Sequence, residues 1–245
     1  MRECCHTRLT QNNKNTKMKT KTLLIAAAAL AAGVISSQAQ VYSQNVVGYA
    51  NVVLQSGYNL VVNQFNCGVS NGANEIFPNI PDGTTCLQWN GSGYTYTFKD
   101  SSAPPALWYM DDYGTPTNPP TLKPGTAVFL QVGALVTNTM AGTVVPNVGA
   151  TYTNSLVTGY NMVGSAIPVG GSMTNSLFAF TPPDGTTVLQ YNGVGYTYNF
   201  FDQSAPPVQW YMDDYGTPTN APNINVGQGF FMQMGGAFKY IQAMP

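Results

Sequence analysis

One stretch of eleven residues, WYMDDYGTPTN, occurs twice without change, at 108–118 and 210–220, and carries the side chains best suited to chemistry. Each copy holds two adjacent carboxylates, and carboxylate oxygens are ligands that Ca²⁺ prefers. The candidate calcium ligands are Asp111, Asp112, Asp213 and Asp214. Their spacing departs from the D-x-D-x-D-G pattern of an EF-hand loop, so calcium binding is the weaker of several interpretations.

The aromatic residues of the same stretch offer a second chemistry, the stacking of sugar rings. Exposed aromatic faces with carboxyl and amide neighbours are what a carbohydrate site requires. The candidate stacking residues are Trp108, Tyr109, Tyr113, Trp210, Tyr211 and Tyr215. This interpretation predicts a carbohydrate-binding protein with one aromatic site in each copy.

A third interpretation, which we favour, is that the stretch forms a turn with a packed base. Trp108 and Met110 alternate and would point into a core. Asp112 would hydrogen-bond the turn backbone, while Gly114 tolerates a positive φ and Pro116 fixes the exit of the chain. Burial separates the interpretations, because a structural turn needs buried tryptophans and a sugar platform needs exposed ones.

Catalytic chemistry is difficult to assemble from the residues after position 39. That part of the chain has no histidine and no arginine, which excludes Ser-His-Asp and Cys-His arrangements and a bidentate phosphate clamp. Asp111 and Asp112 are neighbours that would point to opposite faces of a strand, so they cannot flank a sugar as a glycosidase pair does. The sequence therefore predicts a non-enzymatic protein without a cofactor. We expect a structural or adhesive role at the cell surface or outside the cell, with carbohydrate binding as the alternative.

Charge after position 39 is sparse and negative. Three lysines stand there against one glutamate and eight aspartates, a net charge of −6. Nucleic-acid binding is not expected, because it depends on basic side chains that neutralise phosphates.

The N-terminal segment is typical of a secretory signal. Lys19 and Lys21 precede an apolar run from Leu23 to Ile35, and small residues at Ser37 and Ala39 suit a signal peptidase. We expect cleavage before residue 40, secretion, and no membrane span afterwards; a retained anchor is the alternative. Expected partners are an extracellular polysaccharide or other surface proteins. Residues 1–17 fit poorly ahead of this signal, which could begin at Met18.

Two copies of a larger unit follow at an offset of 102 residues. The offset holds without a gap from 57 to 131, and 34 of the 51 positions in 81–131 match their copies. Alternation in TTCLQWN predicts a strand with Leu87 and Trp89 on one face and Cys86 on the other. Alternation in YTYTF places Tyr94 and Tyr96 on one face, and the NGSG between the two segments predicts a β-hairpin. GYNLVVNQF and GTAVFLQV are further strand candidates, and residues 73–77 could form a short helix.

Strand-length segments separated by Gly, Pro and Asn predict an all-β fold. We expect two tandem homologous repeats of about 100 residues, each sandwich-like or barrel-like, since this period is too long for a solenoid. The predicted parts are an N-terminal extension with signal peptide at 1–39, repeat 1 at 40–146 and repeat 2 at 147–245. One pseudo-symmetric domain built from both halves is the alternative.

The repeat motifs support a resemblance. GYNLVVNQF, DGTTCLQWN and LKPGTAVFLQ, with GYNMVGSAI, DGTTVLQYN and INVGQGFFMQ, resemble a repeat of uncharacterised secreted bacterial β-proteins. In that repeat a G-x-N-L strand opens the unit, a D-G-T strand follows and a P-G-x-G-[FY]-[FW] strand closes it. The resemblance implies a secreted β-repeat and no activity. Repeat 1 departs from the closing pattern at Thr126 and Ala127, where repeat 2 has Gln228 and Gly229.

Cys67 and Cys86 are the cysteines that remain after position 39, and both become valine in repeat 2, at Val169 and Val188. A joint replacement by apolar residues is what a buried disulfide would leave, and exported cysteines usually pair. We therefore expect a Cys67–Cys86 disulfide, with two separate buried thiols as the alternative.

Overall fold

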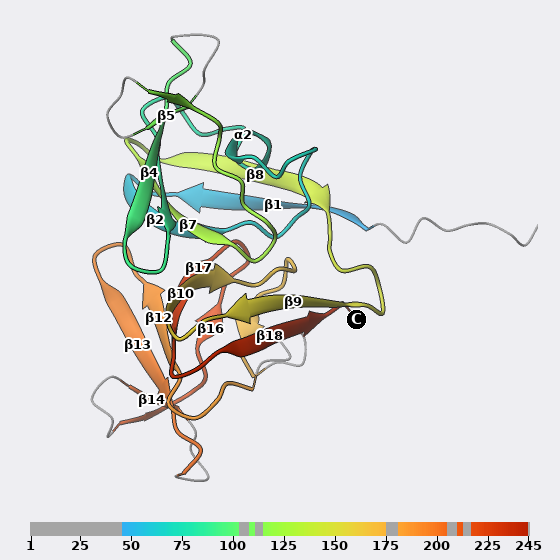
Figure 1. Cartoon of the computed structure of the whole chain (residues 1–245), viewed down its shortest axis with the longest axis vertical. Coiled ribbons are helices and arrows are strands. Elements are labelled where there is room, and N and C mark those ends of the chain that lie inside the picture. The colour runs from blue at the N-terminus through green and yellow to red at the C-terminus, as the bar shows by residue number, and fades with distance from the viewer. Residues whose placement is uncertain are drawn as a thin grey trace, which may run out of the picture. The chain divides into compact units, whose positions relative to one another are not determined.

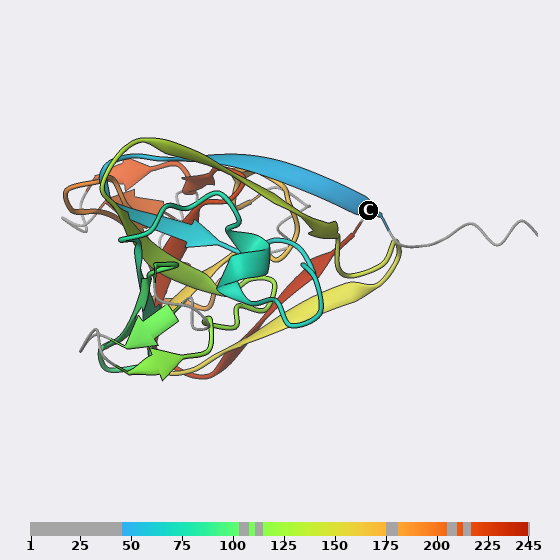
Figure 2. The ribbon, with the colours of Figure 1, turned by 90° about the horizontal axis from the view of Figure 1, so that it is seen from above.

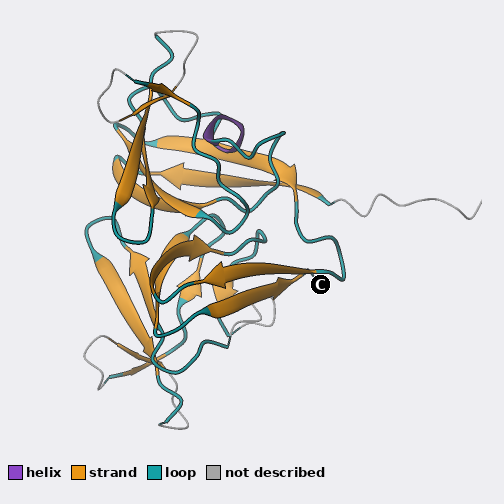
Figure 3. Cartoon of the chain, in the orientation of Figure 1, coloured by secondary structure: helices purple, strands orange, loops and turns teal. Residues whose placement is uncertain are grey.

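The computed structural model describes residues 46–102, 108–110, 115–174, 181–204, 210–212 and 217–244, all within one compact unit. Strands dominate, and the fold is all-β as predicted, with two similar six-stranded antiparallel sheets, one in each repeat (Figure 1, Figure 3). The sheets do not close into barrels, which leaves the sandwich form of the prediction. The division into two domains near Pro146 remains a prediction; that residue lies between the last strand of repeat 1 and the first of repeat 2.

The two large sheets have the same strand order. In repeat 1 the order is β2 (Gly57–Val62), β7 (Ala127–Val132), β3 (Thr85–Trp89), β4 (Tyr94–Lys99), β5 (Trp108–Met110) and β6 (Pro116–Thr117). In repeat 2 it is β10 (Gly159–Gly164), β17 (Gly229–Met234), β12 (Thr187–Tyr191), β13 (Tyr196–Phe201), β14 (Trp210–Met212) and β15 (Pro218–Thr219). Every strand of the second large sheet begins 102 residues after its counterpart in the first, so the sequence offset is also the structural one.

Each repeat closes with a two-stranded ribbon made from its first and last strands. The ribbons pair β1 (Val47–Leu54) with β8 (Val136–Thr143), and β9 (Thr151–Leu156) with β18 (Phe238–Ala243). A further short pair joins β11 (Gly171–Ser172) to β16 (Asn223–Ile224). The helix α2 (Ala73–Ile76) confirms the short predicted helix and packs against β8 (Figure 2). Its Glu75 carboxylate accepts hydrogen bonds from the amides of Val69 and Gly72, both at 2.9 Å.

Both faces of β7 are buried from Ala127 to Leu130, which explains why these four residues are all apolar. Val128 and Leu130 point into a core that the ribbon and α2 cover. Ala127 and Phe129 point the other way, into a core that contains residues of both repeats. Alternate side chains of a strand face opposite sides of its sheet, so one strand serves two cores.

The two repeats meet through equivalent backbone groups. The amide of Val62 donates to the carbonyl of Gly227 at 3.0 Å, and the amide of Gly164 donates to the carbonyl of Gly125 at 3.1 Å. These two bonds interchange when 102 is added to or subtracted from each number. The junction is therefore isologous, as in a twofold dimer, but within one chain.

Two pairs of equivalent residues face each other at this junction. A Cβ atom added to Gly164 would lie 2.7 Å from the Cβ of Val62, its counterpart in repeat 1. A Cβ added to Gly229 would lie 2.7 Å from the Cβ of Ala127, again its own counterpart. Only one member of each pair has room for a side chain. This explains why repeat 1 departs from the closing motif at Ala127.

The predicted disulfide is wrong. Cys67 and Cys86 are both buried, free thiols. The Cys67 thiol lies 3.8 Å from Asn63 Oδ1 and 3.7 Å from the carbonyl of Phe65. Burial raises the pKa of Cys67 to about 11 and that of Cys86 to about 12, so both stay protonated at neutral pH. The shared replacement by valine reflects a need for small apolar side chains, which free cysteine satisfies.

Candidate functional site

The repeated stretch forms the same hairpin in both copies. The amide of Met110 donates to the carbonyl of Thr115 at 2.9 Å, and Met212 donates to Thr217 at the same distance. Trp108 and Trp210 are 0% and 4% exposed, which confirms their predicted burial. The inward orientation predicted for Met110 is wrong, since Met110 and Met212 are both 42% exposed. The tips of both hairpins, with Asp111, Asp112, Tyr113, Asp213, Asp214 and Tyr215, lie outside the described residues. Calcium binding there is therefore still only an interpretation.

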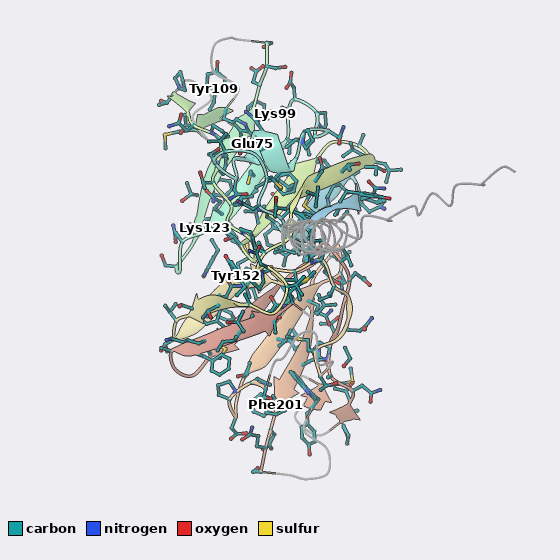
Figure 4. All side chains as sticks on the ribbon, turned by 90° about the vertical axis from the view of Figure 1, so that its right-hand side faces the viewer. Glu75, Lys99, Tyr109, Lys123, Tyr152 and Phe201 are labelled. Carbon is teal, nitrogen blue, oxygen red and sulfur yellow. The ribbon has the colours of Figure 1, made fainter. Side chains whose placement is uncertain are left out.

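The buried tryptophans do not form the sugar platform considered from the sequence. The indole Nε1–H of Trp108 donates to Asn74 Oδ1 at 2.6 Å. The indole of Trp210 packs against Phe201, with ring centroids 5.0 Å apart, and its Nε1–H has no acceptor among the described residues. Tyr109 is buried and Tyr211 is half-buried, and Figure 4 labels Tyr109 near the outer end of repeat 1. The described bases of the two hairpins are packed structural elements.

A groove between the repeats is the strongest candidate site, and it has two adjoining halves. A polar cavity of about 400 Å³ and an aromatic cavity of about 210 Å³ share the side chains of Tyr58 and Tyr191. The aromatic half is lined by Tyr58, Leu87, Tyr94, Tyr96, Phe129, Tyr191 and Tyr196. The polar half includes Asn51, Gln55, Asn59, Asn192, Asn225 and Gln228. No charged side chain is among the lining residues of either half.

The aromatic half is built on Phe129 of β7. Tyr58 meets the Phe129 ring edge-on at a centroid distance of 6.1 Å, and Tyr191 of repeat 2 does so at 5.1 Å. Tyr94 also contacts Phe129, and its hydroxyl is hydrogen-bonded to that of Tyr196, its own counterpart. Burial raises the pKa of Tyr94 and of Tyr196, so these phenols stay neutral and able to hydrogen-bond.

The polar half combines amides that hold the backbone with amides that face solvent. Asn59 Nδ2 donates to the carbonyl of Gln55 at 2.8 Å, and Asn192 Oδ1 accepts from the amide of Gly195 at 2.8 Å. Both shape the loops that border the groove. The exposed side chains of Gln55 and Asn225 have no partner among the described residues, so their amides are available to a ligand.

The junction beside the groove is fixed by polar contacts that cross from one repeat to the other. The Tyr152 hydroxyl donates to the carbonyl of Pro124 at 2.8 Å; Figure 4 labels Tyr152 and Lys123 near this border. The buried Gln64 amide accepts from the amide of Gly227 and donates to the carbonyl of Ile167, each at 2.8 Å. A satisfied buried amide is costly to disturb, so the groove walls are held in place.

Sequence reasoning missed the groove residues Tyr58 and Tyr191. Alternation in YTYTF placed Tyr94 and Tyr96 on one face, but it gave no sign that repeat 2 would add Tyr191 to that face. Two further features are absent from the described part of the chain. It contains no group of three or more His, Cys, Asp or Glu side chains arranged to hold a metal. It also contains no helix of the length and apolar character needed to cross a membrane.

Comparison with known proteins identifies no relative of this chain. No protein-family model matches the chain, and neither a curated protein nor a solved structure is significantly similar to it. The candidate site therefore rests on geometry and chemistry.

Proposed function

We propose that this is a secreted, non-enzymatic adhesive protein that binds neutral carbohydrate in the groove between its repeats. The observation that carries the proposal is the lining of the groove, where exposed tyrosine rings adjoin side-chain amides without any charged group. The proposal replaces one aromatic site per repeat with one groove to which both repeats contribute.

The chemistry of this lining suits a sugar. The apolar C–H face of a pyranose can stack on the rings of Tyr58 and Tyr96, which are 43% and 40% exposed. Its hydroxyls can bond to the amides of Gln55 and Asn225, which both donate and accept. A few fixed polar groups beside an apolar wall are typical of ligand sites of roughly 300–1,000 Å³. Without a basic side chain in the lining, acidic glycans gain no charge-assisted bond there.

Secretion and the lack of catalysis are supported by the sequence. The Lys-rich start and apolar run before residue 40 are typical of a signal peptide. The chain after residue 39 has neither histidine nor arginine, which removes the commonest general base and the fork that clamps phosphate. The resemblance to secreted bacterial β-repeat proteins points in the same direction. Adhesion needs no catalysis; it requires only a stably folded protein that binds its partner.

A glycan array probed with the chain from residue 40 onward tests the proposal. We expect neutral oligosaccharides to bind and Tyr58→Ala to weaken binding at least tenfold. The matched control is Tyr160→Ala, since Tyr160 is the counterpart of Tyr58, is 42% exposed, and does not line the groove. Binding of no neutral glycan, or an equal loss in both variants, would overturn the proposal.

A further inference from the structure

Positions 89 and 191 are equivalent in the two repeats, yet their side chains end in different places. Trp89, at the end of β3, packs edge-on against Phe231 of repeat 2 at a centroid distance of 5.8 Å. Its indole Nε1–H then donates to the backbone carbonyl of Tyr160 at 2.9 Å. The indole therefore spans the space between β3 and the strand β10 of the other repeat.

Tyr191 makes the first of these contacts and not the second. It packs edge-on against Phe129, the counterpart of Phe231, at 5.1 Å. Its hydroxyl donates to the carbonyl of Gly193, inside its own hairpin, at 2.8 Å. The carbonyl equivalent to the acceptor of Trp89 belongs to Tyr58, and the space between Tyr58 and Tyr191 is the groove.

We propose that residue 191 determines where this protein binds carbohydrate: tyrosine leaves the groove open on one side of the junction, while Trp89 bridges the equivalent space on the other. This inference rests on the proposed function. It predicts one carbohydrate site per chain, because the aromatic surfaces on the two sides of the junction are alike but only the one beside Tyr191 is open. The polar surroundings of these surfaces differ as well, since the counterparts of Gln55 and Asn225 are Val157 and Lys123.

Exchanging the two residue types tests the two sides of the junction separately. Tyr191→Trp places an indole where Trp89 has one, with the carbonyl of Tyr58 as acceptor, and closes the groove. Trp89→Tyr removes the bridge to Tyr160 and opens an aromatic cavity beside Tyr160 and Tyr198, without the amides that Gln55 and Asn225 supply to the first groove. These two tyrosines are already 42% and 38% exposed, much as their groove counterparts are.

Isothermal titration with maltohexaose, cellohexaose and chitohexaose as neutral probes measures the stoichiometry. We expect one bound oligosaccharide per chain for the wild type and for Trp89→Tyr, and none for Tyr191→Trp. A wild-type stoichiometry of two, retained binding by Tyr191→Trp, or loss of binding in Trp89→Tyr would each overturn the inference. Melting temperatures identify any variant that has lost its fold.

A readout without sugar separates this inference from the proposed function. The indole N–H of Trp89 is hydrogen-bonded and should exchange slowly with deuterium by NMR. Tyr191→Trp should add one more slowly exchanging indole N–H if the new side chain bridges to Tyr58. A fast-exchanging new indole would overturn the inference. If the three probes fail to bind the wild type while the new indole is protected, the proposed function fails for these sugars and the closure of the groove stands.

Discussion

The outer hairpins and the junction between the repeats show opposite patterns of sequence identity. The hairpins WYMDDYGTPTN are identical in both copies, and each closes through bonds within its own repeat. At the junction, Val62 faces Gly164 and Ala127 faces Gly229, so counterparts differ where they touch each other. Tyr94 and Tyr196 also meet as counterparts but stay the same, since one hydroxyl can donate to the other. Counterpart residues can stay identical where each packs within its own repeat. They differ where they touch each other and compete for the same space.

The largest loss of stability should follow when both members of one junction pair carry a side chain. Gly164→Val places a Cβ within 2.7 Å of the Val62 Cβ, and overpacking of this kind should destabilise the protein by about 3 kcal/mol. Urea denaturation measures the change. Val62→Gly in the same chain should restore part of the loss, because it exchanges the two residues across the pseudo-twofold axis. If the double variant were no more stable than Gly164→Val, the direct contact between these counterparts would be ruled out as the cause.

A smaller loss should follow when the amide that joins the repeats is removed. Gln64→Leu leaves the buried amide of Gly227 and the carbonyl of Ile167 without their partner, and should cost about 2–3 kcal/mol. Gln242→Leu is the matched control, since Gln242 bonds only to groups of repeat 2. Hydrogen exchange at the Gly227 amide should accelerate in the first variant and much less in the second. Equal acceleration in both would show that Gln64 has no special role at the junction.

The two buried tryptophans should respond differently to the same substitution. Trp108→Phe leaves Asn74 Oδ1 without its donor, whereas the Trp210 Nε1–H has no acceptor among the described residues to lose. We expect Trp108→Phe to be more destabilising than Trp210→Phe by about 1–2 kcal/mol in chemical denaturation. The reverse order would show that the hydrogen bond between Trp108 and Asn74 does not contribute the expected stability.

The smallest predicted effect is a change in how the stability of the protein depends on pH. Backbone amides of Gly72 and Val69 lower the pKa of Glu75 to about 2, from an ordinary value of 4.5. A lowered folded-state pKa contributes stability that is present above 4.5 and is lost as the pH falls towards 2. Glu75→Gln should lower the melting temperature at pH 7 and change it little near pH 2. Position 177, the counterpart in repeat 2, is leucine, so this acid dependence belongs to repeat 1. An equal decrease at both pH values would assign the effect to packing.

The sequence predicted the features that depend on near neighbours along the chain. Period-two alternation placed Cys86 on one face of β3 and Leu87 with Trp89 on the other, as the structure has them. Turn residues and alternation likewise predicted the hairpins and the burial of Trp108 and Trp210. These features rest on sterics and hydrogen bonds within a few residues, which each repeat specifies for itself.

Whether Cys67 and Cys86 form a disulfide could not be predicted from such local patterns. A shared change to valine reports only that both positions are buried, and burial is equally compatible with two free thiols. The sequence also could not predict the position of the groove. Tyr58 and Tyr191 are 133 residues apart, and they share a cavity only because two sheets pack through Phe129 and Phe231.

By itself, then, the sequence determined the all-β class, the twofold repetition and the inward tryptophans, because alternation and turn chemistry act locally. Only the tertiary structure decided that Val62 must face a glycine, that Trp89 bridges the repeats, and that Tyr191 borders an open groove. The reason is that these outcomes depend on space shared by residues about 70 or more positions apart. The available space is known only when both halves are folded against each other.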